Sequence, residues 1–218
     1  MKELSLKYIV KEPKNYSEST TLLLLLHGYG SNEQDLFSFA QELDENLLIV
    51  SAQAPLELGF NSYAWYTINF NTSEGGNFSD IPEAIKAREK IAVFIDELQQ
   101  LYHIQPSKTI LLGFSQGTIL SYSIALNYPE KVQKVIALSG YINEKLLPEN
   151  IKTKDYQKLD FFISHGTVDQ VIPISWAEKA PSFLNNLGIK TIFKTYPIGH
   201  GVSPPNFFDF KKWLDERI

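Results

Sequence analysis

Short apolar runs alternate along this chain with longer segments in which apolar residues recur every three or four positions. The short runs are rich in leucine, isoleucine and valine, and several are apolar at every position. That pattern is typical of strands buried on both faces of a mostly parallel sheet. Seven strands are predicted, over residues 4–10, 21–26, 47–51, 109–112, 132–138, 161–164 and 191–196.

The segments with helical periodicity lie between these strands. The longest runs from Pro82 to Tyr102, and Ser79 or Asp80 can cap its amino end. Four shorter helices are predicted, over residues 33–43, 116–127, 175–187 and 206–217. Strands that alternate with helices in this way predict an α/β fold, a three-layer sandwich with a mostly parallel central sheet.

Residues 56–80 fit neither pattern. They combine glycines and asparagines with aromatic residues, too polar for a pair of strands and too rich in glycine for a helix. A long loop inside a compact domain is usually functional, so we expect this segment to cover a binding pocket. No linker interrupts the chain elsewhere, and a single domain over residues 1–218 is expected.

The composition excludes several classes of protein. The chain has no cysteine, which excludes disulfide scaffolds, thiolate metal sites and a cysteine nucleophile. The formal net charge is −5 and the basic residues form no cluster, so a nucleic-acid partner is not expected. Because the start lacks the apolar core of a signal peptide and the longest aliphatic run covers only residues 22–26, we expect a cytoplasmic protein without stable membrane insertion.

One short motif predicts the chemistry. Gly113-Phe114-Ser115-Gln116-Gly117 follows a predicted strand and precedes a predicted helix, which is the context of a nucleophile elbow. In such an elbow the serine adopts strained backbone angles, and the residues two before and two after it are small because strand and helix approach closely. Ser115 is therefore the candidate nucleophile, and the alternative is a serine in an ordinary turn.

A serine hydroxyl needs a base to take its proton, and the chain has four histidines. His200 lies between two glycines in the loop after the last predicted strand, and it is the strongest candidate. His27 and His165 each end a predicted strand; we expect them to organise the backbone there, with a direct catalytic role as the alternative. His103 lies near the end of the longest helix, where solvent exposure or the helix terminus accounts for it.

The base in turn needs a carboxylate to orient it, and the oxyanion needs hydrogen-bond donors. Asp169 follows the strand predicted over residues 161–164, and the order Ser, Asp, His is that of α/β-hydrolases. Its alternative role is to cap the turn at Pro173. We expect the oxyanion donors to be the backbone amides of Gln116, at a helix amino end, and of Tyr29, in a glycine-containing loop.

Four segments in this order resemble the phospholipase/carboxylesterase family of α/β-hydrolases, which includes acyl-protein thioesterases and small bacterial carboxylesterases. Residues 26–30 are similar to the family's oxyanion loop, 113–117 to its nucleophile elbow, 165–169 to its acid loop and 196–200 to its histidine loop. The resemblance spans nearly the whole chain. It implies a serine hydrolase of carboxylic esters or thioesters, with Ser115, His200 and Asp169 as a catalytic triad.

The substrate side of the site is expected to be apolar. We expect the pocket to be lined by Leu56, Leu58, Phe60, Trp65, Tyr66 and Tyr141, with ordinary packing as the alternative for each. Tyr29 and Thr118 depart from the family pattern, in which leucine and glycine are common, and we expect both to alter the mouth of the pocket. Phe60, Tyr63 and Phe70 motivate a second hypothesis, a homodimer formed through the aromatic segment.

No cofactor or metal is expected. Glu33 stands where the third glycine of a dinucleotide-binding motif belongs, and the histidines lack the spacing of metal ligands. Two other functions stay open, a non-catalytic binding module on the same scaffold and a hydrolase of another bond, dienelactone or peptide. A cysteine nucleophile would have favoured the dienelactone hydrolase hypothesis, and the chain has no cysteine. A length of 218 residues leaves little room for the extra domains that are usual in peptidases of this fold.

Overall fold

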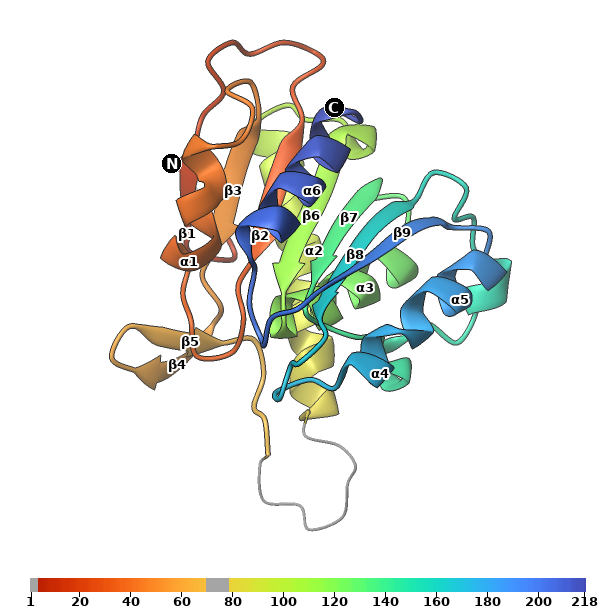
Figure 1. The fold of residues 1–218 in the computed structure, drawn as a ribbon. Coiled ribbons are helices and arrows are strands. Elements are labelled where there is room, and N and C mark those ends of the chain that lie inside the picture. Colours follow the sequence, from red (N-terminus) through yellow and green to blue (C-terminus); the bar gives the residue numbers. More distant parts are fainter. Residues whose placement is uncertain (1–3, 70–78) are drawn as a thin grey trace.

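The computed structural model describes residues 4–69 and 79–218. Its main sheet contains β1 (Tyr8–Lys11), β2 (Leu22–Leu26), β3 (Leu48–Ala52), β6 (Thr109–Phe114), β7 (Lys134–Leu138), β8 (Asp160–Gly166) and β9 (Lys190–Tyr196). The strands lie in the order β1-β3-β2-β6-β7-β8-β9 (Figure 1). β1 pairs antiparallel with β3, and the other neighbours pair in parallel.

Helices cover both faces of this sheet, which confirms the predicted three-layer α/β architecture (Figure 1). The α-helices are α1 (Gln34–Phe37), α2 (Ile81–Leu101), α3 (Gln116–Asn127), α4 (Ile174–Ala177), α5 (Lys179–Asn186) and α6 (Pro204–Asp215). Short 3-10 helices are η1 (Ser38–Gln41), η2 (Pro106–Lys108), η3 (Glu144–Leu146) and η4 (Ile151–Thr153).

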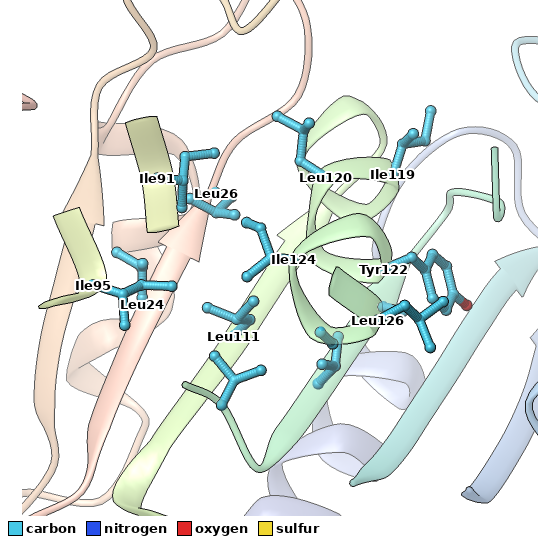
Figure 2. Packing of buried hydrophobic residues seen from close by; sticks show 14 of the residues in the cluster. Leu24, Leu26, Ile91, Ile95, Leu111, Ile119, Leu120, Tyr122, Ile124 and Leu126 are labelled. Atoms are coloured by element: carbon cyan, nitrogen blue, oxygen red, sulfur yellow. The ribbon is translucent and has the colours of Figure 1, made fainter. Parts of the chain in front are cut away.

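The five leucines of β2 show how the core is divided. All five are fully buried, and successive side chains point to opposite faces of the sheet. Leu24 and Leu26 belong to the layer with α2 and α3, where Figure 2 shows them beside Ile91 and Ile95 of α2. The intervening leucines pack with the apolar side of α6. Burying each such side chain contributes roughly 1.5–3 kcal/mol, so β2 anchors both layers.

The strand order places a switch point between β2 and β6. From β2 the chain proceeds to β3 on one side, whereas from β6 it proceeds through α3 to β7 on the other. In open parallel sheets, ligands bind in the crevice outside the carboxyl ends of strands at such a point. Leu26 pairs with Gly113 in the register, so the loop after β2 and the start of α3 lie next to each other there.

The prediction that residues 56–80 are too polar for paired strands is wrong for the first part of the segment. β4 (Leu56–Gly59) and β5 (Ser62–Ala64) form an antiparallel hairpin. Its turn is made by three consecutive residues with positive φ, Gly59 (90°), Phe60 (52°) and Asn61 (57°), a conformation that glycine and asparagine favour. The conformation of the turn residues therefore allows this segment to form paired strands, although the segment is polar. The predicted cover also includes residues 70–78, which lie outside the described residues.

Several predicted boundaries also shift. Residues 4–7 are not part of the first strand, because the Ser5 amide donates to the Glu97 carboxylate (2.8 Å) rather than to the sheet. The helix predicted over residues 33–43 is α1 followed by η1, and the one predicted over 175–187 is divided into α4 and α5. Pro181 accounts for this division because it lacks an amide proton and therefore fits the first turn of α5.

The longest helix matches its prediction closely. Of its two candidate caps, Asp80 is the one used, since its side chain accepts a hydrogen bond from the Glu83 amide (2.9 Å). Neither this helix nor any other within residues 4–69 and 79–218 is long and apolar enough to cross a membrane.

Candidate active site

Ser115 lies at the turn between β6 and α3, and its backbone is strained. Its φ of 52° and ψ of −113° fall outside the regions that a residue with a side chain normally adopts. Strain of this kind costs on the order of 1–3 kcal/mol and persists only where the surrounding structure enforces it. The predicted elbow geometry is therefore present.

Two glycines make this elbow possible. A Cβ on Gly113 would lie 2.6 Å from the carbonyl carbon of Gly117, and a Cβ on Gly117 would lie 1.9 Å from the carbonyl oxygen of Leu26. Both distances are far below van der Waals contact. The first turn of α3 thus presses against β6 and the end of β2, which holds Ser115 at the switch point.

Gly117→Ala is expected to destabilise the protein strongly. Since the Leu26 carbonyl belongs to a central strand, the backbone must move to admit the methyl group, and the free energy of unfolding should fall by about 4 kcal/mol or more. Urea denaturation followed by circular dichroism measures this. Gly201→Ala is the matched control, because a Cβ there would meet no described atom within 4 Å. Equal stability of the two variants would contradict this packing.

A chain of hydrogen bonds joins Ser115 to His200 and Asp169. His200 Nε2 lies 2.9 Å from Ser115 Oγ, and His200 Nδ1 lies 2.7 Å from Asp169 Oδ2. A carboxylate only accepts, so Nδ1 carries the proton and Nε2 is left to accept from the serine hydroxyl. The ring of Phe114 packs against the imidazole, with centroids 4.9 Å apart. The structure thus brings together the three residues selected from the sequence.

The carboxyl group of Asp169 is fully buried and accepts further hydrogen bonds. Oδ1 accepts from the amides of Val171 (2.8 Å) and Ile172 (2.9 Å). Burial acts to raise the pKa of Asp169, but the hydrogen bonds from His200 and from these amides outweigh it and hold the pKa below its ordinary value. Asp169 is therefore ionised at neutral pH, and it both caps the turn before Pro173 and orients His200.

His27 and His165 bond to the backbone, as predicted. His165 Nε2 donates to the Ile172 carbonyl (2.9 Å) and lies 3.3 Å from Asp169 Oδ2. His27 Nε2 accepts from the Ala54 amide (3.1 Å), so the proton lies on Nδ1, which donates to the Gly28 carbonyl (2.8 Å). Both rings are buried and both organise loops at the carboxyl edge of the sheet.

Burial of His27 predicts a pH-dependent stability. Desolvation lowers the pKa of His27 from its ordinary value of 6.5, so below that pH the unfolded chain binds a proton that the folded chain excludes. The free energy of unfolding should therefore fall as pH falls from about 7 to about 5.5, by at most about 1.4 kcal/mol per pH unit. Urea unfolding at both pH values measures the slope. His27→Gln should flatten it, and an unchanged slope in that variant would refute the assignment to His27.

The two predicted oxyanion donors belong to two segments that adjoin Ser115. Gln116 is the first residue of α3, where amides have no acceptor within the helix and the helix dipole favours negative charge. Tyr29 follows Gly28, whose Cα is so close to the nucleophile that a Cβ there would lie 3.4 Å from Ser115 Cβ. The loop that carries Tyr29 and the start of α3 therefore lie next to each other at the nucleophile.

The residues predicted to line the pocket occupy different positions. Phe60, at the hairpin tip, is fully exposed, and Leu58 is 45% exposed. Trp65 and Tyr66 are fully buried, and Leu56 is partly exposed. Tyr141 lies after β7 at the carboxyl edge of the sheet, and its side chain is partly exposed.

Tyr141 has an aromatic neighbour that the sequence did not single out. Its ring packs edge-on against Trp176 of α4, with centroids 4.9 Å apart, and both side chains are partly exposed. The homodimer through the aromatic segment stays a prediction. Phe60 is available at the surface, Tyr63 is partly buried, and Phe70 lies outside the described residues.

Two roles at the site were missed from the sequence. The buried side chain of Gln116 accepts from the Trp65 amide (2.8 Å) and donates to the Tyr66 carbonyl (2.8 Å). Thr118 is also fully buried, so the expectation that it alters the pocket mouth is wrong. Its hydroxyl lies 2.7 Å from the carbonyls of Gly113 and Leu138 and joins β6 to β7 beneath the elbow.

Within the described part of the chain, no cluster of three or more histidine, aspartate and glutamate side chains is arranged to hold a metal ion. Asp169, His165 and His200 instead form the hydrogen bonds and contacts given above.

The chain is similar in sequence to known enzymes over most of its length. The chain is 27% identical to acyl-protein thioesterase 1 of Emericella nidulans over 224 residues, 91% of each protein. It is 28% identical to a probable carboxylesterase, SOBER1-like, of Arabidopsis thaliana over 212 residues, 93% of this chain and 80% of that protein. The chain spans most of the length of both relatives.

Solved structures agree in fold. Esterase PE8 superposes with a TM-score of 0.85 at 26% identity, over 99% of this chain and 100% of that one. A Bacillus cereus carboxylesterase gives a TM-score of 0.82 at 21% identity, over 98% and 95%. The family model described as phospholipase/carboxylesterase matches residues 8–218. The resemblance predicted from the sequence is confirmed, and the chain belongs to the phospholipase/carboxylesterase family of α/β-hydrolases.

Proposed function

We propose that this protein hydrolyses carboxylic esters or thioesters through an acyl-enzyme formed on Ser115. The observation that carries the proposal is the hydrogen-bonded chain from Ser115 Oγ to His200 to Asp169 on a strained elbow. A base and its orienting carboxylate in line with a serine hydroxyl are what acyl transfer requires.

In the first half-reaction Ser115 Oγ attacks the acyl carbon, and its proton passes to His200 Nε2. The carbonyl electron pair moves onto oxygen, and the amides of Gln116 and Tyr29 donate to this oxyanion. Collapse of the tetrahedral intermediate breaks the bond to the leaving alcohol or thiol, which takes the proton from His200. Asp169 stabilises the imidazolium while it exists.

In the second half-reaction water attacks the acyl-enzyme, and His200 accepts a proton from that water. Collapse returns the proton to Ser115 and releases the carboxylic acid. His200 keeps 16% of its side chain exposed while Asp169 is buried, which allows water to approach the base but not the carboxylate. Every step uses side chains and amides of the chain itself.

The relatives bear on the substrate class. The Emericella nidulans relative is named an acyl-protein thioesterase and the Arabidopsis thaliana relative a probable carboxylesterase, which favours acyl esters and thioesters over dienelactone or peptide bonds. We propose that Tyr141 and Trp176 form an apolar wall beside Ser115 for part of such a substrate. A non-catalytic binding module is disfavoured, because such a module has no need of a serine, histidine and aspartate in hydrogen-bonded order.

Initial rates on p-nitrophenyl esters from acetate to palmitate, with a thioester of the preferred acyl group, test this proposal. We expect turnover that is blocked by one equivalent of an alkyl fluorophosphonate. The acyl group with the highest kcat/KM would indicate the length of acyl chain that the apolar wall can contact. Folded protein that hydrolyses none of these substrates and does not react with the fluorophosphonate would overturn the proposal in favour of a binding module.

A further inference from the structure

The loop after β2 must hold its backbone in one conformation if Tyr29 is to serve as an oxyanion donor. This oxyanion loop, residues 27–31, contains Gly28 and Gly30, and Gly30 has a φ of +78°. Glycine has the largest backbone freedom of any residue, so the sequence of the loop does not fix its shape. An oxyanion donor is effective only within a few tenths of an ångström of its optimum position. Residues outside the loop must therefore hold the loop in place.

The β4–β5 hairpin provides that support (Figure 1). The Gly30 amide donates to the Tyr63 carbonyl (2.9 Å), and the Tyr63 amide donates to the Ser31 carbonyl (2.8 Å). The Ser62 hydroxyl donates to the Gly30 carbonyl (2.7 Å). Three hydrogen bonds thus attach one strand of the hairpin to the carboxyl end of the loop.

Trp65 holds the amino end of the same loop. Its indole Nε1 donates to the His27 carbonyl (2.9 Å), and its ring packs on the imidazole of His27 with centroids 5.5 Å apart. The Ala54 amide, just before the hairpin, donates to His27 Nε2. The loop is therefore fixed at both ends by one segment of chain.

Gln116 connects that segment to the other oxyanion donor. Its side chain bonds the Trp65 amide and the Tyr66 carbonyl, and its own backbone amide is the second proposed donor. The two donors, one in the loop after β2 and one at the start of α3, are separated by more than eighty residues in the sequence. The route between them is short, from the Gln116 side chain through Trp65 to the His27 carbonyl.

We propose that the β4–β5 hairpin positions the oxyanion loop against α3, with Trp65 and Gln116 as positioning residues that set the distance between the two oxyanion donors. This inference rests on the proposed acyl-enzyme mechanism for its catalytic meaning, although the positioning itself is a structural claim. It assigns Trp65 to the support of the oxyanion site rather than to a substrate wall.

Trp65→Phe tests the proposal because it keeps an aromatic ring and removes the indole donor. Trp213→Phe is the matched control, since Trp213 is also buried but its indole N–H has no partner among the described residues. We expect Trp65→Phe to lower kcat about tenfold while KM stays within about twofold of its wild-type value. Removing an oxyanion donor lowers kcat by roughly 10²–10³-fold, and a donor that is only displaced should lower it less. The inhibition constant of an alkyl boronic acid, whose serine adduct is tetrahedral, should rise by the same factor as kcat falls.

Ser62→Ala provides a second variant for the case in which Trp65→Phe does not fold. Ser62 is partly exposed and loses one hydrogen bond to Gly30, so a smaller decrease in kcat is expected, again at constant KM. Trp213→Phe should leave kcat and KM unchanged even where its melting temperature falls. A rise in KM with constant kcat in Trp65→Phe would overturn the proposal and restore Trp65 as a substrate wall.

Hydrogen exchange separates this inference from the proposed function. In Trp65→Phe, amides of the oxyanion loop should exchange faster than in wild type, and in Trp213→Phe they should not. If wild-type protein hydrolyses no ester, the proposed function fails, but the exchange result still decides whether the hairpin positions the loop. Unchanged exchange in folded Trp65→Phe, with or without activity, would contradict it.

Discussion

Replacing Ser115 by alanine is expected to lower kcat for ester hydrolysis by roughly 10⁶-fold while leaving the fold intact. The substitution removes Oγ, the atom that lies 2.9 Å from His200 Nε2, and with it the nucleophile. It keeps a Cβ at a residue whose φ is 52°, so the strain of the elbow is the same in both proteins. Rates on the preferred p-nitrophenyl ester, with circular dichroism of both proteins, measure the effect.

Ser123→Ala is the control for this experiment. Ser123 lies on the same helix and is buried, but its hydroxyl donates to the Leu146 carbonyl (2.9 Å) and not to the site. Activity close to wild type is expected for it. If Ser115→Ala kept more than about one hundredth of the activity, another nucleophile would have to be sought, since residual rates without the serine are far lower in enzymes of this type.

Asp169→Asn is expected to lower kcat by about 10⁴-fold. Oδ1 of Asp169 accepts two backbone hydrogen bonds, so the amide oxygen of the asparagine takes that position and its NH2 group faces His200. The imidazole must then accept at Nδ1 and carry its proton on Nε2. In that tautomer His200 cannot take the proton of Ser115, although the side-chain volume is unchanged.

KM should change little in this variant, because Asp169 is buried behind His200 and does not face the substrate. Asp215→Asn is the matched control, since that carboxylate forms a surface ion pair with Lys211 on α6 (2.6 Å) and is expected to leave kcat unchanged. A loss of less than about tenfold in Asp169→Asn would show that another group orients His200.

The sheet and the three residues of the hydrogen-bonded chain could be predicted from the sequence for identifiable reasons. Strands buried on both faces, such as β2, leave an uninterrupted apolar run. The elbow is a local motif, and its glycines are required by contacts that the motif itself creates. His200 and Asp169 follow from chemistry and chain order, because parallel strands bring their carboxyl ends to one edge.

Side chains that act across long distances in the sequence could not be found in this way. The Gln116 side chain bonds residues about fifty positions earlier, and Thr118 bonds Leu138 twenty positions later. Neither partnership leaves a periodic or local pattern. The β4–β5 hairpin was missed because its three residues with positive φ include Phe60, whose type does not indicate such a turn.

Asp169 shows that two interpretations of one residue need not compete. From the sequence it could orient the base or cap the turn before Pro173. In the structure Oδ1 accepts from the turn amides and Oδ2 accepts from His200, so the same carboxylate does both. The turn cap fixes the carboxylate, and the fixed carboxylate then sets the tautomer of the base.

The most direct test of the central claim is to trap the acyl-enzyme. Wild-type protein mixed with a p-nitrophenyl ester and quenched in acid within milliseconds would be analysed by intact-protein mass spectrometry and then by peptide mapping. We predict one added acyl group, located on the peptide that contains Ser115 and absent from Ser115→Ala. An acyl group on a different residue, or turnover by Ser115→Ala at the wild-type rate, would contradict the account.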